Sequence, residues 1–85
     1  MGNINAMRNT VSLMLSDDWQ ERFVAEYRQL ETRIESLGRM IKNWDELSFQ
    51  PNCSKRTLEI QLEHMNNYFE SLKVRASIEN INLNI

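Results

Sequence analysis

The sequence predicts an all-α protein built on an antiparallel two-helix hairpin, with a short helix before it. Two runs of apolar residues repeat every seven positions, and a short polar segment with the chain's single proline separates them. The runs are Phe23, Tyr27, Leu30, Ile34, Leu37, Ile41 and Trp44, then Leu58, Leu62, Met65, Phe69, Leu72 and Ala76. A seven-residue repeat places its members along one helix face. Two such faces joined by a short connection are typical of an antiparallel helix pair that oligomerises into a larger helical assembly.

The first long helix is expected over about residues 18–44. A capping box is expected at its start, formed either by Asp17 with Gln20 or equally by Asp18 with Glu21. In either case the aspartate side chain accepts hydrogen bonds from free backbone N–H groups of the first turn. Gly38 weakens the helix. Its missing side chain is expected to admit a neighbouring backbone.

The second long helix is expected to begin near Ser54, a good N-cap residue, and to end around Asn80. In the connection before it, Leu47 and Phe49 are expected to fold back over the end of the hairpin. After Asn80 an alternating pattern replaces the helical one, so the tail either frays or pairs as a short strand with another copy.

Residues 1–15 are predicted to be an extension that forms a short helix, and residues 16–85 the hairpin domain. Ile4, Met7, Val11 and Met14 lie on one face of that helix. Asparagines around them lower helix propensity, so this helix is expected to persist only if it packs on something.

Composition excludes several function classes. A net charge of −2 argues against binding to polymeric DNA or RNA, which needs a basic face. There is no signal-peptide pattern and no apolar run long enough for a membrane helix, so we expect a cytoplasmic protein. No nucleophile has a partner base, and no glycine-rich phosphate loop or Cys/His metal cluster is present. We therefore expect no enzyme, metal site or cofactor.

The second helix carries more apolar surface than a hairpin covers. Beside its seam, a second stripe consists of Ile60, Val74, Ile78 and Ile81. An exposed stripe of this kind usually marks a contact with another chain, which favours a homo-oligomer. The alternative is that the N-terminal segment covers this stripe, and the protein can also combine this cover with a homo-oligomer.

One flank of each long helix is free of acids. The flanks hold Gln61, Tyr68, Arg75 and Asn82 on the second helix, and Arg22, Gln29, Ser36 and Asn43 on the first. Arginine makes forked contacts to phosphate and tyrosine offers a stacking face for a base, so these flanks suit a planar anionic ligand. The alternative is a solvated helix face.

Other residues carry weaker signals. Arg28, Arg39 and Lys42 cluster on the outer side of the first helix, where Glu35 is placed to pair with Arg39. The ring of Tyr27 is expected to pack in the core with its hydroxyl group at an edge. Trp19 and Trp44 are expected to be packing residues, and His64 is expected to be solvated on the polar side of the second helix.

Together these residues resemble a family of small helical-hairpin proteins. The matching residues are Arg22, Phe23, Glu26, Tyr27, Leu30, Arg33, Ile34 and Leu37, then Leu58, Gln61, Leu62, Met65, Tyr68, Leu72, Arg75 and Ala76. The pattern resembles the phage-encoded anti-CBASS and Thoeris anti-defence sponges, including relatives from crAss-like phages. The resemblance covers roughly residues 18–83.

The resemblance implies a function. Sponges of this superfamily assemble as oligomers, in characterised members hexamers, and capture cyclic oligonucleotides or cyclic ADP-ribose signals in the host cytoplasm without cleaving them. Their pockets lie between protomers, which implies ligand contacts here from Arg22, Tyr27, Tyr68 and Arg75, with Lys42 a weaker candidate. A helical inhibitor of a host defence enzyme and a structural coiled-coil assembly protein are the alternatives.

Overall fold

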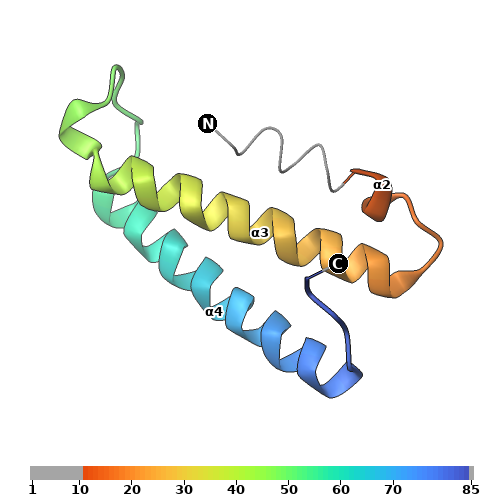
Figure 1. The fold of residues 1–85 in the computed structure, drawn as a ribbon. Helices are drawn as coiled ribbons and strands as arrows, with labels where there is room; N and C mark the ends of the chain where they lie inside the picture. The colour runs from red at the N-terminus through yellow and green to blue at the C-terminus, as the bar shows by residue number, and fades with distance from the viewer. Residues whose placement is uncertain (1–10, 85) are drawn as a thin grey trace.

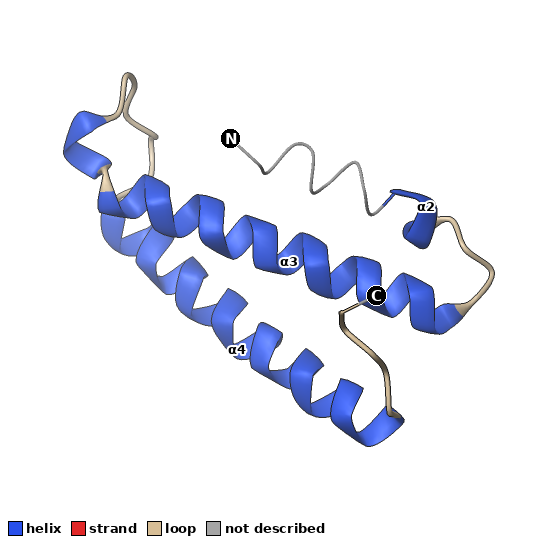
Figure 2. Cartoon of the chain, viewed as in Figure 1, coloured by secondary structure: helices blue, strands red, loops and turns tan. Residues whose placement is uncertain are grey.

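The computed structural model describes residues 11–84, and its regular elements in that range are all helices, with no strand. Its elements are α2 (Val11–Met14), α3 (Trp19–Lys42), a 3-10 turn η1 (Trp44–Glu46) and α4 (Lys55–Glu79). In Figure 1, α3 and α4 run antiparallel and α2 lies beside the start of α3. Figure 2 shows that loops are confined to the connections and the C-terminal tail. The predicted helical class is confirmed.

The start of α3 is fixed by an aspartate cap. Asp18 has an extended backbone, with φ −82° and ψ 116°, and its Oδ1 accepts a hydrogen bond of 2.9 Å from the N–H of Gln20. Ser16 Oγ in turn accepts from the N–H of Asp18 at 3.0 Å. Of the two predicted caps, the structure therefore selects Asp18.

The second helix is capped at both ends. Ser54 Oγ accepts from the N–H of Thr57 at 3.1 Å, which confirms Ser54 as the N-cap. At the other end Asn80 adopts a left-handed conformation, with φ 56° and ψ 40°. The N–H of Ile81 then donates to the carbonyl of Ala76 at 2.9 Å. This arrangement is a Schellman-type helix end, in which asparagine can replace glycine.

The core lies in the predicted seam between α3 and α4. Phe23, Leu30, Leu72 and Ala76 form a buried cluster. The partly buried residues packed against this cluster are Tyr27, Ile34, Met65, Phe69, Ile81 and Leu83. Within it the rings of Tyr27 and Phe69 stack, with centroids 4.7 Å apart and planes 18° apart.

The expectation that the tail frays is wrong, whereas its pairing as a strand with another copy stays a prediction. Ile81 and Leu83 pack against the buried cluster, so the tail neither frays nor forms a strand within the described residues. The reason is the left-handed Asn80, which turns the chain back toward α3 after α4 ends (Figure 1). Ile81 therefore belongs to the core rather than to an outer stripe.

Three other local expectations are also wrong. A side chain built at Gly38 would meet no atom within 4 Å, so no backbone approaches there. Phe49 is 68% exposed and covers nothing, although Leu47 is half-buried. Glu35 and Arg39 are both exposed on α3 and form no ion pair with each other.

A further side of α3 is buried. Val24, Ala25 and Thr32 are buried but do not belong to the cluster shared with α4. The short helix α2 packs against α3, and the side-chain amide of Gln29 donates to the sulfur of Met14. The expected short helix thus exists at Val11–Met14. The predicted positions Ile4 and Met7 lie outside the described residues.

The cap at Asp18 can be tested against its neighbour. Asp18→Ala removes the bond to Gln20 and should cost about 1 kcal/mol, which lowers the midpoint of thermal unfolding by about 4–8 °C. Asp17→Ala removes an equal charge without removing a cap, so its midpoint should shift much less. Circular dichroism melts of both variants provide the measurement, and equal shifts would contradict the assignment of the cap.

Candidate functional site

The open end of the hairpin, formed by residues 16–23 at the start of α3 and residues 75–83 at the end of α4, contains two of the predicted ligand residues. Arg75 reaches from α4 across to α3. Its guanidinium carbon lies 5.1 Å from the ring centroid of Phe23 and 5.8 Å from that of Trp19. These separations fit cation–π contacts, which hold the cation against the aromatic rings.

Arg22 joins the same end from α3. Its Nη1 donates to the backbone carbonyl of Ser16 at 2.7 Å, which ties the connection before α3 to the first turns of the helix. A guanidinium group has several N–H donors, and this bond uses one nitrogen. The side chain is exposed, so the remaining donors face solvent and can reach a ligand.

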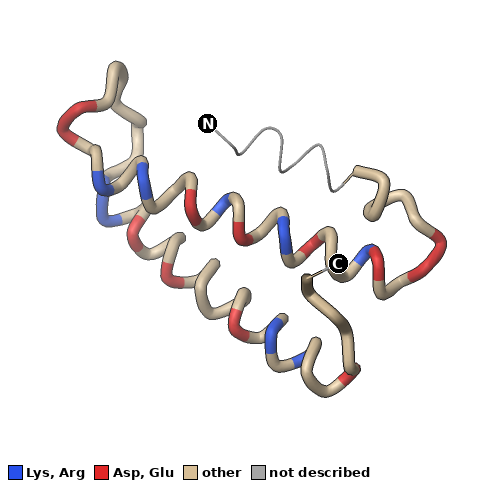
Figure 3. Tube along the Cα trace, in the orientation of Figure 1, with Lys and Arg blue, Asp and Glu red and all other residues tan. Residues whose placement is uncertain are grey.

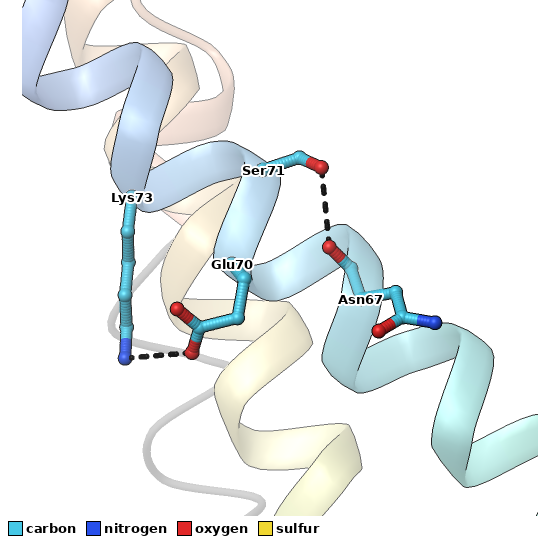
Figure 4. A network of polar contacts seen from close by, with 4 residues as sticks. All are labelled: Asn67, Glu70, Ser71 and Lys73. Atoms are coloured by element: carbon cyan, nitrogen blue, oxygen red, sulfur yellow. Dashed lines mark hydrogen bonds and ion pairs between the residues drawn. The ribbon is translucent and has the colours of Figure 1, made fainter.

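Neither arginine is neutralised by a carboxylate. Within residues 11–84 the recorded ion pair joins Lys73 Nζ and Glu70 Oε1 at 3.3 Å, and Lys73 also lies over the ring of Phe69 (Figure 4). The nearby Asp18 carboxylate is engaged with the backbone of Gln20 as the cap. Arg22 and Arg75 therefore keep their charge available for an anion.

The two predicted tyrosines have different surroundings. Tyr27 stacks on Phe69 in the seam, so its ring is part of the packing between α3 and α4. Tyr68 is 47% exposed on α4, two helical turns before Arg75. Because two turns span about 11 Å along a helix, Tyr68 lies on the same flank but outside the open end.

Lys42 lies far from the other candidates. It stands at the C-terminal end of α3, where Arg39 precedes it and the first turn of α4 adds Lys55 and Arg56. Figure 3 shows these basic segments together at the closed end of the hairpin, where the connecting loop lies. The distance along α3 from Arg22 to Lys42 is about 30 Å, so one chain does not bring them together.

Trp19 is the residue that sequence analysis assigned to packing and the structure places at the site. Its side chain is 42% exposed at the first position of α3, next to the guanidinium of Arg75. The available signal was its spacing of four residues from Phe23, which puts both rings on one side of the helix. Nothing in the sequence alone linked that side to Arg75.

A shallow groove at the closed end is a poorer candidate for an anion. It lies between α3 and α4 and contains two glutamates, which oppose a negative ligand. Its lining residues are Ile41, Glu59, Leu62, Glu63, Asn66 and Asn67.

Within residues 11–84, no group of three or more His, Cys, Asp and Glu side chains could hold a metal ion. No helix there combines the length and apolar character required to cross a bilayer.

The fold and the open end define a small α-helical protein with an arginine–aromatic surface and a seam between two antiparallel helices. Comparison with protein families gives a match to the Sequestin family over residues 17–78, which is more than half of the chain. The chain belongs to the Sequestin family, whose name indicates a sequestering function. Comparisons with curated proteins and with solved structures gave no match.

Proposed function

We propose that this protein is a phage anti-defence protein that binds cyclic nucleotide immune signals and sequesters them without cleavage. The ligand class comprises cyclic oligonucleotides and cyclic ADP-ribose isomers. The observation that carries the proposal is the open end, where neither Arg22 nor Arg75 has a carboxylate partner within residues 11–84 and Arg75 lies against the rings of Trp19 and Phe23. Membership of the Sequestin family supports the sequestering part of the proposal.

The chemistry of the open end fits that ligand class. A cyclic nucleotide presents phosphate groups and flat heterocyclic bases. Guanidinium groups make charge-assisted, forked hydrogen bonds to phosphate oxygens, and aromatic rings stack on bases. Cys53 and His64 lie outside the open end in the sequence. The proposal is therefore one of binding without conversion of the ligand.

The affinity required of a sequestering protein favours more than one chain per site. A nanomolar Kd corresponds to about −12 kcal/mol. Two charge-assisted arginine contacts and one stacked base together contribute about 4–9 kcal/mol, before the cost of association is subtracted. A second copy that adds its own arginine or tyrosine supplies the binding free energy that one chain lacks. We therefore place the complete pocket between protomers.

Exposed apolar residues on α4 support self-association. Ile60, Val74 and Ile78, which we call the outer stripe, are 40%, 60% and 73% exposed. They lie on the side of α4 away from the buried cluster. Exposed apolar side chains in a row are typical of an interface. The proposed assembly is thus a homo-oligomer that buries the outer stripe.

Ligand binding is tested by a thermal-shift panel of cyclic dinucleotides, cyclic trinucleotides and cyclic ADP-ribose isomers. A ligand at 100 times its Kd adds about 2.7 kcal/mol to the stability of the folded state, which corresponds to a shift of about 10–20 °C for a domain this small. Arg75→Ala should weaken binding by about 10- to 100-fold, because one charge-assisted contact is lost.

Arg56→Ala is the matched control for the arginine. It removes the same side chain from the opposite end of α4, and its binding should equal that of the wild type. Ligand recovered from denatured protein should be intact. The absence of a shift across the panel, or chemical conversion of the ligand, would contradict the proposed function.

Self-association is tested by placing a charge in the outer stripe. Val74→Asp should convert the oligomer to monomer with unchanged helix content, because an aspartate buried at an apolar interface loses its hydration. Light scattering after size exclusion gives the mass. Asn66→Asp adds the same charge two turns earlier, on a different side of α4 from the outer stripe, and should leave the mass unchanged. A wild-type monomer would contradict the assembly.

The outer stripe also favours a second candidate function, inhibition of a host defence enzyme through a helix face that fits an apolar groove. This function would be favoured if the wild type were monomeric and bound no member of the panel. Val74→Asp would then abolish inhibition, whereas Arg75→Ala would not.

A further inference from the structure

We infer that Trp19 is the residue on which a base of the ligand stacks, with Arg75 beside it to contact the adjoining phosphate. This inference rests on the proposed function and adds to it a specific aromatic contact. It also requires a ligand that joins a flat heterocycle to a phosphate, so a sugar phosphate without a base should bind weakly.

Exposure separates Trp19 from the other aromatic residues near the arginines. Phe23 is only 4% exposed, so its ring is covered by the seam and by Arg75. Tyr27 is stacked on Phe69 within the packing between the helices. Trp19 keeps 42% of its surface open while it lies within 5.8 Å of the Arg75 guanidinium. Of these three rings, Trp19 has the open surface that a base requires.

The setting of Trp19 reduces the cost of binding. It is the first residue of α3, directly after the Asp18 cap, so the backbone that carries it is fixed by the hydrogen bond to Gln20. Arg75 is already held against the Trp19 and Phe23 rings. A ligand therefore meets a cation and a ring that are ordered before it arrives, and less conformational entropy is lost on binding.

Because Trp19 contacts Arg75, this ring can both position the arginine and stack on a base. Indole is the strongest of the aromatic partners for a cation, and its exposed surface stacks on any base. One side chain thus positions the arginine and binds the heterocycle. Tyr68, two turns away on α4, can make a separate contact but is not the ring next to Arg75.

The experiment combines equilibrium dialysis with tryptophan fluorescence, using cyclic di-AMP and cyclic ADP-ribose as probes. Dialysis of the wild type shows whether either probe binds. Trp19→Leu should then weaken binding roughly tenfold or more, because stacking on the ring is lost. Trp19→Phe keeps an aromatic ring and should restore most of the affinity. Trp44→Leu, the same substitution in η1 beyond the far end of α3, should bind like the wild type.

Fluorescence separates a stacking role from a structural one. In Trp44→Phe the emission comes from Trp19 alone, since the chain contains two tryptophans. A bound base should quench this emission, whereas ribose phosphate at the same concentration should not. Circular dichroism of Trp19→Leu should match that of the wild type.

The outcomes distinguish the two levels of the proposal. If neither probe nor any other member of the panel binds the wild type, the proposed function and this inference both fail. If a probe binds but Trp19→Leu retains wild-type affinity, or Trp19 emission is unchanged on binding, the inference alone is overturned and the function stands.

Discussion

The packing of α3 on α4 through one apolar seam is the constraint on which the rest of the structure depends. The buried cluster of Phe23, Leu30, Leu72 and Ala76 sets the register of the two helices. A two-helix core is thin, so peripheral pieces contribute to it. The tail after Asn80 returns Ile81 and Leu83 to the cluster, and α2 packs on another side of α3. Each addition buries apolar surface that two helices alone would expose.

The same register creates the candidate site. Arg75 reaches the rings of Trp19 and Phe23 only because Leu72 and Ala76 place that turn of α4 opposite the start of α3. A slip of one helical turn would move it by about 5.4 Å along the helix and break both contacts. Phe23 belongs both to the core and to the surface under Arg75, so a change at this residue affects both the packing and the candidate site. Arg22 strengthens that end by bonding to the carbonyl of Ser16.

Much of the fold was predictable from the sequence because apolar spacing and caps are local signals. The seam and the Ser54 cap follow from residue types at fixed offsets, whereas the choice between Asp17 and Asp18 as the cap of α3 needed the structure. The return of Ile81 was not predictable, since it depends on the left-handed backbone at Asn80. The exposure of Phe49 likewise reflects a loop whose path is not set by helical periodicity.

The candidate site was predictable only in part. Arg22 and Arg75 were found from the acid-free flanks, and the structure places both at the open end. Lys42 was assigned by the resemblance alone and lies at the opposite end of α3. Trp19 was missed because its importance comes from a contact across the hairpin, and helical spacing within α3 does not reveal which residue of α4 lies opposite.

The central claim is that a cyclic nucleotide binds at the open end, on Arg22, Arg75 and Trp19. Nitrogen–proton correlation spectra test it most directly, because the two tryptophan indoles report from opposite ends of the first long helical segment. On addition of a bound member of the panel, the account predicts that the Trp19 indole and the Arg22 and Arg75 guanidinium signals shift while the Trp44 indole stays in place. Shifts centred on Trp44 and Lys42, with Trp19 unchanged, would contradict it.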